Sequence, residues 1–122
     1  PLAESKVISP HDLWDLPLIT SRQTLVSNEF SKWFGKDYEE LNIVTTYNLV
    51  YNATQMVKAG VGYALCLDNL VNTSGDSELC FRPLTPSLDA RLDIVWKKYQ
   101  IFSSASQKFL QRLQQEFTNS AD

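Results

Sequence analysis

Residues 45–67, TTYNLVYNATQMVKAGVGYALCL, constrain the fold more than any other stretch of the chain. Apolar residues at helical spacing predict a helix with one core-facing side: Leu49, Val50, Ala53, Met56 and Val57. Asn48 is expected to cap this helix and Gly60 to end it in the left-handed conformation. After Gly62, the apolar run 63–67 is typical of a buried strand. A helix that leads into such a strand is half of a βαβ unit, so a parallel sheet is predicted.

Length, charge and hydropathy narrow the class of protein. A chain of 122 residues is long enough for one domain with its own core. Its net charge of −3 and pI near 5.1 argue against nucleic-acid binding by phosphate neutralisation. No apolar run approaches the roughly 18 residues of a membrane span, and no signal-peptide pattern opens the chain. The sequence therefore predicts a cytoplasmic protein with no membrane partner.

The cysteines and the histidine do not suggest a metal site. Cys66 and Cys80 form no CxxC pair, and His11 is the one histidine. Reduced, partly buried thiols are the favoured interpretation, and a disulfide between neighbouring strands is the alternative. No metal and no cofactor are predicted.

The other segments predict alternating helices and strands with an antiparallel edge. Caps, prolines, glycines and apolar periodicity define them. In order they are an extended segment at 1–8, a short helix capped by Ser9 and ended by Pro17, a strand at 18–20, a helix over 24–34 ended by Gly35, a strand at 41–45, the helix and strand of residues 45–67, strands at 79–84 and 91–99, and an amphipathic helix capped by Ser103 or Ser104. The fold class predicted is α/β.

No recognisable catalytic set is present. His11 lies beside Asp12 at a helix start, where an exposed or capping histidine is favoured. Cys66 ends an apolar strand and is favoured as a structural thiol, and Glu39 and Glu40 fit a solvated surface. The chain lacks a GxSxG elbow and a glycine-rich phosphate loop. No enzyme activity is predicted.

Ligand binding has better support. In an open α/β sheet, ligands bind at the carboxyl ends of strands, beside helix N-termini. Two polar segments occupy such places here, Ser21-Arg22-Gln23-Thr24 and Thr45-Thr46-Tyr47-Asn48. Their hydroxyls, amides and guanidinium fit a small anion such as a carboxylate. The alternative is that Thr24 and Asn48 only cap helices and that Arg22 is solvated.

Three short passages form an ordered set of motifs along the chain. The first comprises PLA at 1–3, ISPHDL at 8–13 and LPLI at 16–19. The second is MVKAGVGYAL at 56–65, and the third joins the 92–97 strand to FSSASQKFL at 102–110. In this order they resemble the effector-binding domain of LysR-type transcriptional regulators. The ordered set spans most of the chain and is more specific than each motif alone. One departure lies at 66–68, Cys-Leu-Asp, where the family commonly has an apolar residue and a proline.

The resemblance implies one Rossmann-like lobe of a type II periplasmic-binding-protein-like fold, with a mixed sheet and helices on both faces. Residues 1–93 resemble the second lobe, and residues 94–122 resemble the strand and helix that return to the first lobe. That lobe and the winged helix-turn-helix that contacts DNA are absent from this sequence. Together with Pro1 in place of an initiator methionine, this suggests a piece of a longer protein. Apolar surface left uncovered would favour self-association.

The family's cleft residues on this lobe correspond to the two polar segments that follow the predicted strands. The implied effector-binding residues are Ser21, Arg22, Gln23, Thr45, Thr46 and Tyr47. No catalytic residue and no metal ligand are implied. Family dimers pack a second-lobe helix, here the one at 24–34, against a partner's first lobe. Its apolar face is favoured as core, with Glu29 and Lys32 as candidates for the rim of a dimer contact.

Two function classes follow. The first is the sensor part of a LysR-type regulator, which binds a small anionic effector without chemistry and changes the geometry of a DNA-bound homo-oligomer. The second is a free-standing module that pairs with itself or with a related regulator. A reading frame that continues upstream into a helix-turn-helix would favour the first.

Overall fold

The computed structural model describes residues 2–90 and 92–120. The chain divides into two compact units, 1–90 and 91–122, and each is described separately. The lobe boundary that the resemblance implies after residue 93 stays a prediction. The first unit contains, in order, η1 Leu2–Glu4, α1 Pro10–Leu13, β1 Leu18–Ser21, η2 Thr24–Val26, α2 Asn28–Phe34, η3 Tyr38–Glu40, β2 Ile43–Tyr47, α3 Val50–Lys58 and β3 Tyr63–Ala64, where η marks a 3₁₀ helix. The second contains α4 Ser104–Ser120.

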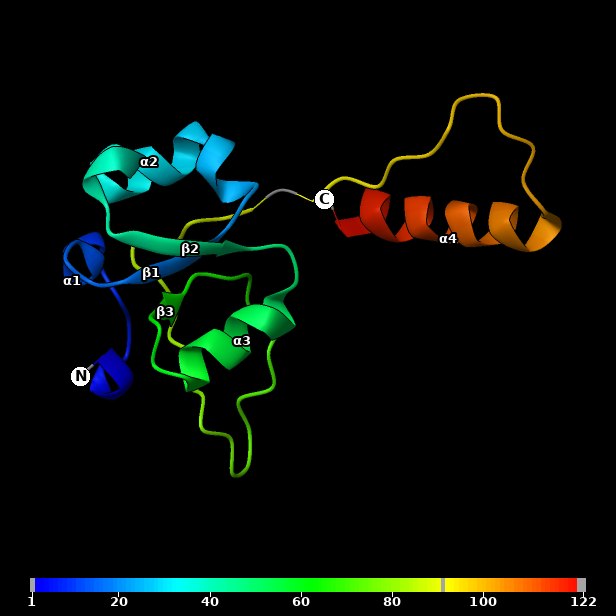
Figure 1. Ribbon diagram of the computed structural model, residues 1–122. Helices are drawn as coiled ribbons and strands as arrows, with labels where there is room; N and C mark the ends of the chain where they lie inside the picture. The colour runs from blue at the N-terminus through cyan, green and yellow to red at the C-terminus, as the bar shows by residue number, and fades with distance from the viewer. Residues whose placement is uncertain (1, 91, 121–122) are drawn as a thin grey trace. The chain divides into compact units, whose positions relative to one another are not determined.

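The strands of the first unit form one parallel sheet in the order β2-β1-β3, with β1 at its centre (Figure 1). Ser21 of β1 lies opposite Tyr47 of β2, and Ile19 lies opposite Ala64 of β3. The parallel sheet predicted from residues 45–67 is therefore confirmed. The mixed sheet is not found, since every strand pairing in the described residues is parallel.

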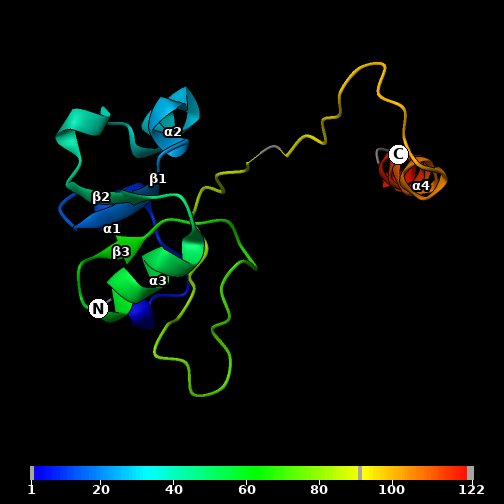
Figure 2. The same ribbon diagram turned by 45° about the vertical axis from the view of Figure 1, so that its right-hand side comes forward.

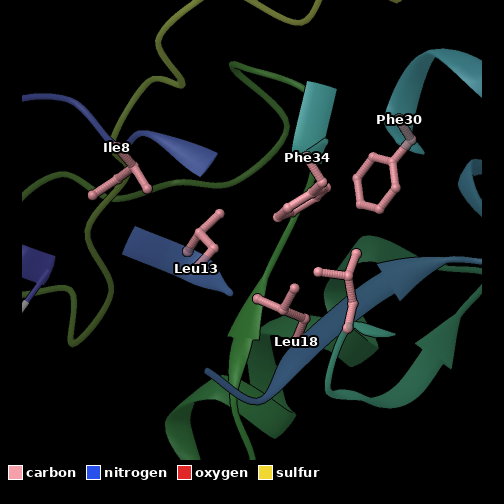
Figure 3. Close-up of a cluster of buried hydrophobic side chains, with 6 residues drawn as sticks. Ile8, Leu13, Leu18, Phe30 and Phe34 are labelled. Carbon is pink, nitrogen blue, oxygen red and sulfur yellow. The ribbon is translucent and has the colours of Figure 1, made fainter. Parts of the chain in front are cut away.

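Helices cover both faces of this sheet. Figures 1 and 2 show α2 and α3 on opposite sides of it. Leu18 of β1 packs in the main core with Phe30 and Phe34 of α2 (Figure 3). Its neighbour Ile19 is equally buried but lies outside that cluster, because successive side chains of a strand point to opposite faces. The main core comprises Ile8, Leu13, Leu18, Phe30, Phe34 and Leu41.

Glycines end the helices and allow one close approach. Gly35 after α2 and Gly60 after α3 have φ of 65° and 76°, as predicted for left-handed helix ends. At Gly62, an added Cβ would lie 2.5 Å from the carbonyl oxygen of Pro17. The same oxygen accepts a 2.8 Å hydrogen bond from the N–H of Tyr63. The absence of a side chain at Gly62 thus lets β3 reach the start of β1.

Two helix starts differ from prediction. The helix expected over 24–34 is split into η2 and α2, because Ser27 between them has an extended backbone. Asn48 does not cap α3, which begins at Val50 with Leu49 as N-cap. The reason is that β2 continues to Tyr47, whose carbonyl accepts a 3.3 Å hydrogen bond from the N–H of Arg22. The chain therefore leaves the sheet later than expected.

Three predicted strands shorten or do not form. The strand at 63–67 is reduced to Tyr63–Ala64 and is only partly buried. Residues 79–84 retain one parallel bridge, between Leu84 and Ile8, and Pro83 has no N–H to donate to a ladder. Residues 92–99 form no strand, because the described part of unit 91–122 offers no strand beside them. Residue 91, at the start of that prediction, lies outside the described residues.

In the second unit, Ser103 caps α4 as predicted. Its hydroxyl oxygen accepts a 3.2 Å hydrogen bond from the N–H of Ser106. Arg112 and Glu116 form an ion pair along the helix at 2.9 Å. An apolar groove of about 410 Å³ is lined by residues of the 94–102 segment and of α4, including Ile94, Trp96, Phe102, Phe109, Leu110 and Leu113. None of the described helices has the length and hydrophobicity needed to cross a lipid bilayer.

Candidate functional site

The carboxyl ends of β1 and β2 meet at one edge of the sheet. Ser21 lies opposite Tyr47 and Thr20 opposite Thr46. The 3.3 Å bond from the N–H of Arg22 to the carbonyl of Tyr47 extends this pairing by one residue. In parallel strands both ends point the same way, toward the place where open α/β sheets bind ligands. The structure therefore brings the two predicted segments, 21–23 and 45–47, together.

The segment after β1 carries the one positively charged side chain of the predicted set. The hydroxyl oxygen of Ser21 accepts a 3.3 Å hydrogen bond from the N–H of Gln23, which closes a tight polar turn. Arg22, within this turn, is exposed, and its guanidinium makes no hydrogen bond or ion pair with the described residues. A guanidinium in this state can offer a bidentate pair of donors to a carboxylate.

The segment after β2 is more enclosed. Thr45 and Thr46 are half-buried. The hydroxyl of Tyr47 donates a 2.7 Å hydrogen bond to the carbonyl of Leu65, which follows β3. Because β1 lies between β2 and β3, this bond links the two outer strands past the central one. Tyr47 thus holds the ends of the outer strands together. Its hydroxyl proton is engaged in this bond and is not free to be donated to a ligand.

Burial sets the ionisation of two groups at this edge. Burial raises the pKa of Tyr47 to about 12, so the phenol stays neutral at physiological pH. Burial also raises the pKa of the Cys66 thiol, and the Asp68 carboxylate adds to that effect. Cys66 and Cys80 are both free thiols; Cys66 is half-buried, as favoured from the sequence, whereas Cys80 is exposed. A protonated, half-buried Cys66 has little nucleophilic character.

Helix dipoles contribute less to this site than predicted. The segment after β1 enters a single 3₁₀ turn, η2, and not the α-helix expected from Thr24. One turn has little of the aligned dipole that attracts anions to a helix start. On the β1 side of the site, the charge of Arg22 and the hydroxyl of Ser21 are therefore the groups that can hold an anion. The arrangement can bind a ligand, and it presents no paired acid and base.

One polar group of the site was not predicted from the sequence. Thr20, the residue before Ser21, is fully buried, and its hydroxyl has no hydrogen-bond partner. The available signal was a hydroxyl residue ending the apolar run LPLI at 16–19, directly before the polar loop.

The remaining candidates have structural roles. The Asp12 carboxylate accepts hydrogen bonds from the Ser9 hydroxyl and N–H, at 2.6 and 2.8 Å, and these lower its pKa. His11 packs on Trp14 with ring centroids 4.2 Å apart. Both residues therefore serve the start of α1, in agreement with the favoured interpretation. Glu40 accepts a 3.0 Å hydrogen bond from the N–H of Asp37 at the surface.

On α2, the core interpretation of the apolar face is confirmed by Phe30 and Phe34. Glu29 and Lys32 are exposed, and their place at a dimer rim stays a prediction. Among the described residues, no group of three or more His, Cys, Asp or Glu side chains is arranged to hold a metal ion.

Comparison with known families decides the classification. The model of the LysR substrate binding domain matches residues 1–118. The chain belongs to this family. A LysR substrate binding domain is the effector-binding, regulatory part of a LysR-type regulator, and its fold is of the periplasmic-binding-protein-like α/β type. No match was found among curated proteins or among solved structures.

Proposed function

We propose that this LysR substrate binding domain senses a small anionic effector at the carboxyl ends of β1 and β2, through residues 21–23 and 45–47. The pairing of Ser21 with Tyr47, beside the unpaired guanidinium of Arg22, is the observation that carries the proposal. This supports the proposal because open α/β sheets bind ligands at the carboxyl ends of their strands, and a cation and several hydroxyl residues follow or end these two strands. Arg22 binds the carboxylate of the effector, and the hydroxyls orient it.

In this proposal the site is one half of a cleft between two lobes. Residues 1–93 form the second lobe, and residues 94–122 return to a first lobe that supplies the other half. Effector binding changes the geometry of a homo-oligomer, which contacts DNA through a winged helix-turn-helix outside these residues. The protein acts in the cytoplasm and performs no catalysis.

Thermal unfolding in the presence of small ligands tests the site. The panel contains acetate, benzoate, succinate, free amino acids, phosphate and sulfate. A ligand that binds only the folded chain stabilises it by about 2.7 kcal/mol at a hundred times its Kd. We expect at least one carboxylate to raise the unfolding temperature, and Arg22→Ala to abolish that shift.

Arg112→Ala is the matched control, because it removes the same charge from an exposed position on α4. It should leave the ligand-induced shift intact. If no carboxylate raises the unfolding temperature of the wild-type chain, or if both variants lose the shift equally, the proposed site is wrong.

The second candidate function, a self-pairing module, has its support in the second unit. Phe109 and Phe117 of α4 are 67% and 61% exposed, and Ile94 and Trp96 are half-exposed. Apolar side chains exposed in this number favour association with another surface. Sedimentation velocity over a hundredfold range of concentration tests this, and a strictly monomeric chain would exclude self-pairing.

A further inference from the structure

Thr20 presents a buried hydroxyl without a partner. Its side chain is fully buried, and its hydroxyl is the one buried side-chain polar atom found unpartnered in the described residues. Buried polar groups are almost always hydrogen-bonded, and one that is not destabilises the fold relative to an apolar group of similar shape. Valine has that shape. The hydroxyl at this position therefore needs a reason other than the stability of the observed conformation.

The position of Thr20 connects it to the strand-end site. It is the residue before Ser21 in the central strand and lies opposite Thr46. The alternation of the strand places it on the same face as Leu18, the face covered by α2. The short helix η2, which follows the polar turn 21–23, packs against β1. Thr20 is thus adjacent in sequence to the proposed effector-binding residues, but it is buried.

The adjacent element, η2, is a single 3₁₀ turn with few stabilising contacts. Within η2, the N–H of Val26 donates to Gln23 at 3.3 Å, and the next N–H, of Ser27, donates to Thr24 at 3.1 Å. Val26 is 86% exposed and so adds little packing. The Tyr38 hydroxyl donates hydrogen bonds to the carbonyls of Thr24 and Ser27 and so holds this turn in place. Moving this single turn away from β1 therefore costs less free energy than exposing the main core.

We propose that Thr20 is a specificity residue of the effector site, and that its hydroxyl bonds an uncharged polar group of the effector once η2 shifts. The inference rests on the proposed function, in which Arg22 binds the carboxylate at the exposed rim. A charged group at the depth of Thr20 would be strongly disfavoured, whereas a hydroxyl is tolerated when it is paired. The effector class is therefore a carboxylate that also carries a hydroxyl group.

Matched pairs of ligands test this on the chain as it stands. Lactate is compared with propionate, and 4-hydroxybenzoate with benzoate, by titration calorimetry. Wild type should prefer the hydroxylated member of a pair by about 2- to 10-fold, the value of one neutral hydrogen bond. Thr20→Val should abolish that preference, and Thr20→Ser should keep it. Thr54→Val is the control, since it removes a hydroxyl from α3 that bonds the Tyr51 carbonyl.

Stability of the free chain gives a second readout. Because the Thr20 hydroxyl has no hydrogen-bond partner in the free chain, its loss in Thr20→Val removes no interaction. The variant should therefore unfold at the same temperature as wild type or higher. A lower unfolding temperature would mean that the hydroxyl has a structural partner such as a buried water, and would overturn the inference. So would an unchanged hydroxyl preference in Thr20→Val. In that case the proposed function survives if Arg22→Ala still abolishes carboxylate binding. If no carboxylate binds wild type, the proposed function fails and this inference fails with it.

Discussion

The contact between Gly62 and Pro17 allows a quantitative prediction for Gly62→Ala. The new Cβ would lie 2.5 Å from the Pro17 carbonyl oxygen, closer than real Cβ atoms come. Relieving this overlap requires the backbone to move, which costs about 1–3 kcal/mol in well-packed regions. The movement also weakens the bond from the N–H of Tyr63 to the same oxygen, worth about 0.5–1.5 kcal/mol. Alanine recovers about 0.4–1 kcal/mol by restricting the unfolded chain. The free energy of unfolding should therefore fall by about 0.5–4 kcal/mol.

Urea unfolding followed by tryptophan fluorescence measures this change. Gly60→Ala is the comparison variant, because its Cβ meets nothing within 4 Å and the substitution is strained only through φ of 76°. That strain costs about 1–2 kcal/mol. The gain from restricting the unfolded chain is the same for both variants, so Gly62→Ala, which costs about 1.5–4.5 kcal/mol before that gain, should match or exceed the loss in Gly60→Ala. A Gly62→Ala chain as stable as wild type would refute the close approach of β3 to β1.

Two further predictions concern the core and the strand ends. Phe34→Ala, at a fully buried position packed on Phe30, should lower the free energy of unfolding by about 3–5 kcal/mol, and an effect below 1 kcal/mol in urea unfolding would contradict the described core. For Tyr47, the folded-state pKa of about 12 exceeds the ordinary value of 10.0, so the phenol stabilises the fold below pH 10 and that contribution is lost as pH rises toward 12. Tyr47→Phe should lower stability by about 0.5–1.5 kcal/mol at pH 8 through loss of the bond to Leu65, and should show a smaller loss between pH 10 and 12 than wild type. If wild type and Tyr47→Phe lose the same amount of stability over this pH range, Tyr47 is not the titrating group.

The features that the sequence predicted well are those fixed by near neighbours in the chain. Gly35 and Gly60 end their helices because each follows an amphipathic run and can adopt positive φ. Ser103 caps α4 through a bond to Ser106, three residues away. The proximity of Ser21 and Tyr47 was also predictable, since parallel strands on either side of a helix must end at the same edge.

The features that the sequence did not predict depend on distant partners. The 79–84 and 92–99 segments have strand-like residues, but a strand needs a neighbour to pair with, and alternation alone does not supply one. The break of the helix at Ser27 coincides with the Tyr38 hydroxyl, which bonds the Ser27 carbonyl at 2.8 Å from eleven residues away. Thr20 is fully buried in the central strand, and that burial depends on which elements pack against β1, which no local pattern specifies.

Binding of a carboxylate at the ends of β1 and β2, beside Arg22, is the basis of the proposed function. The most direct measurement is a proton–nitrogen correlation spectrum of the labelled chain, titrated with the carboxylate that raises the unfolding temperature most. Carboxylate binding at this site should produce saturable shifts concentrated in the backbone amides of residues 20–23 and 45–49, and these shifts should disappear in Arg22→Ala. Shifts confined to the groove formed by residues 94–113, or no saturable shifts at all, would contradict it.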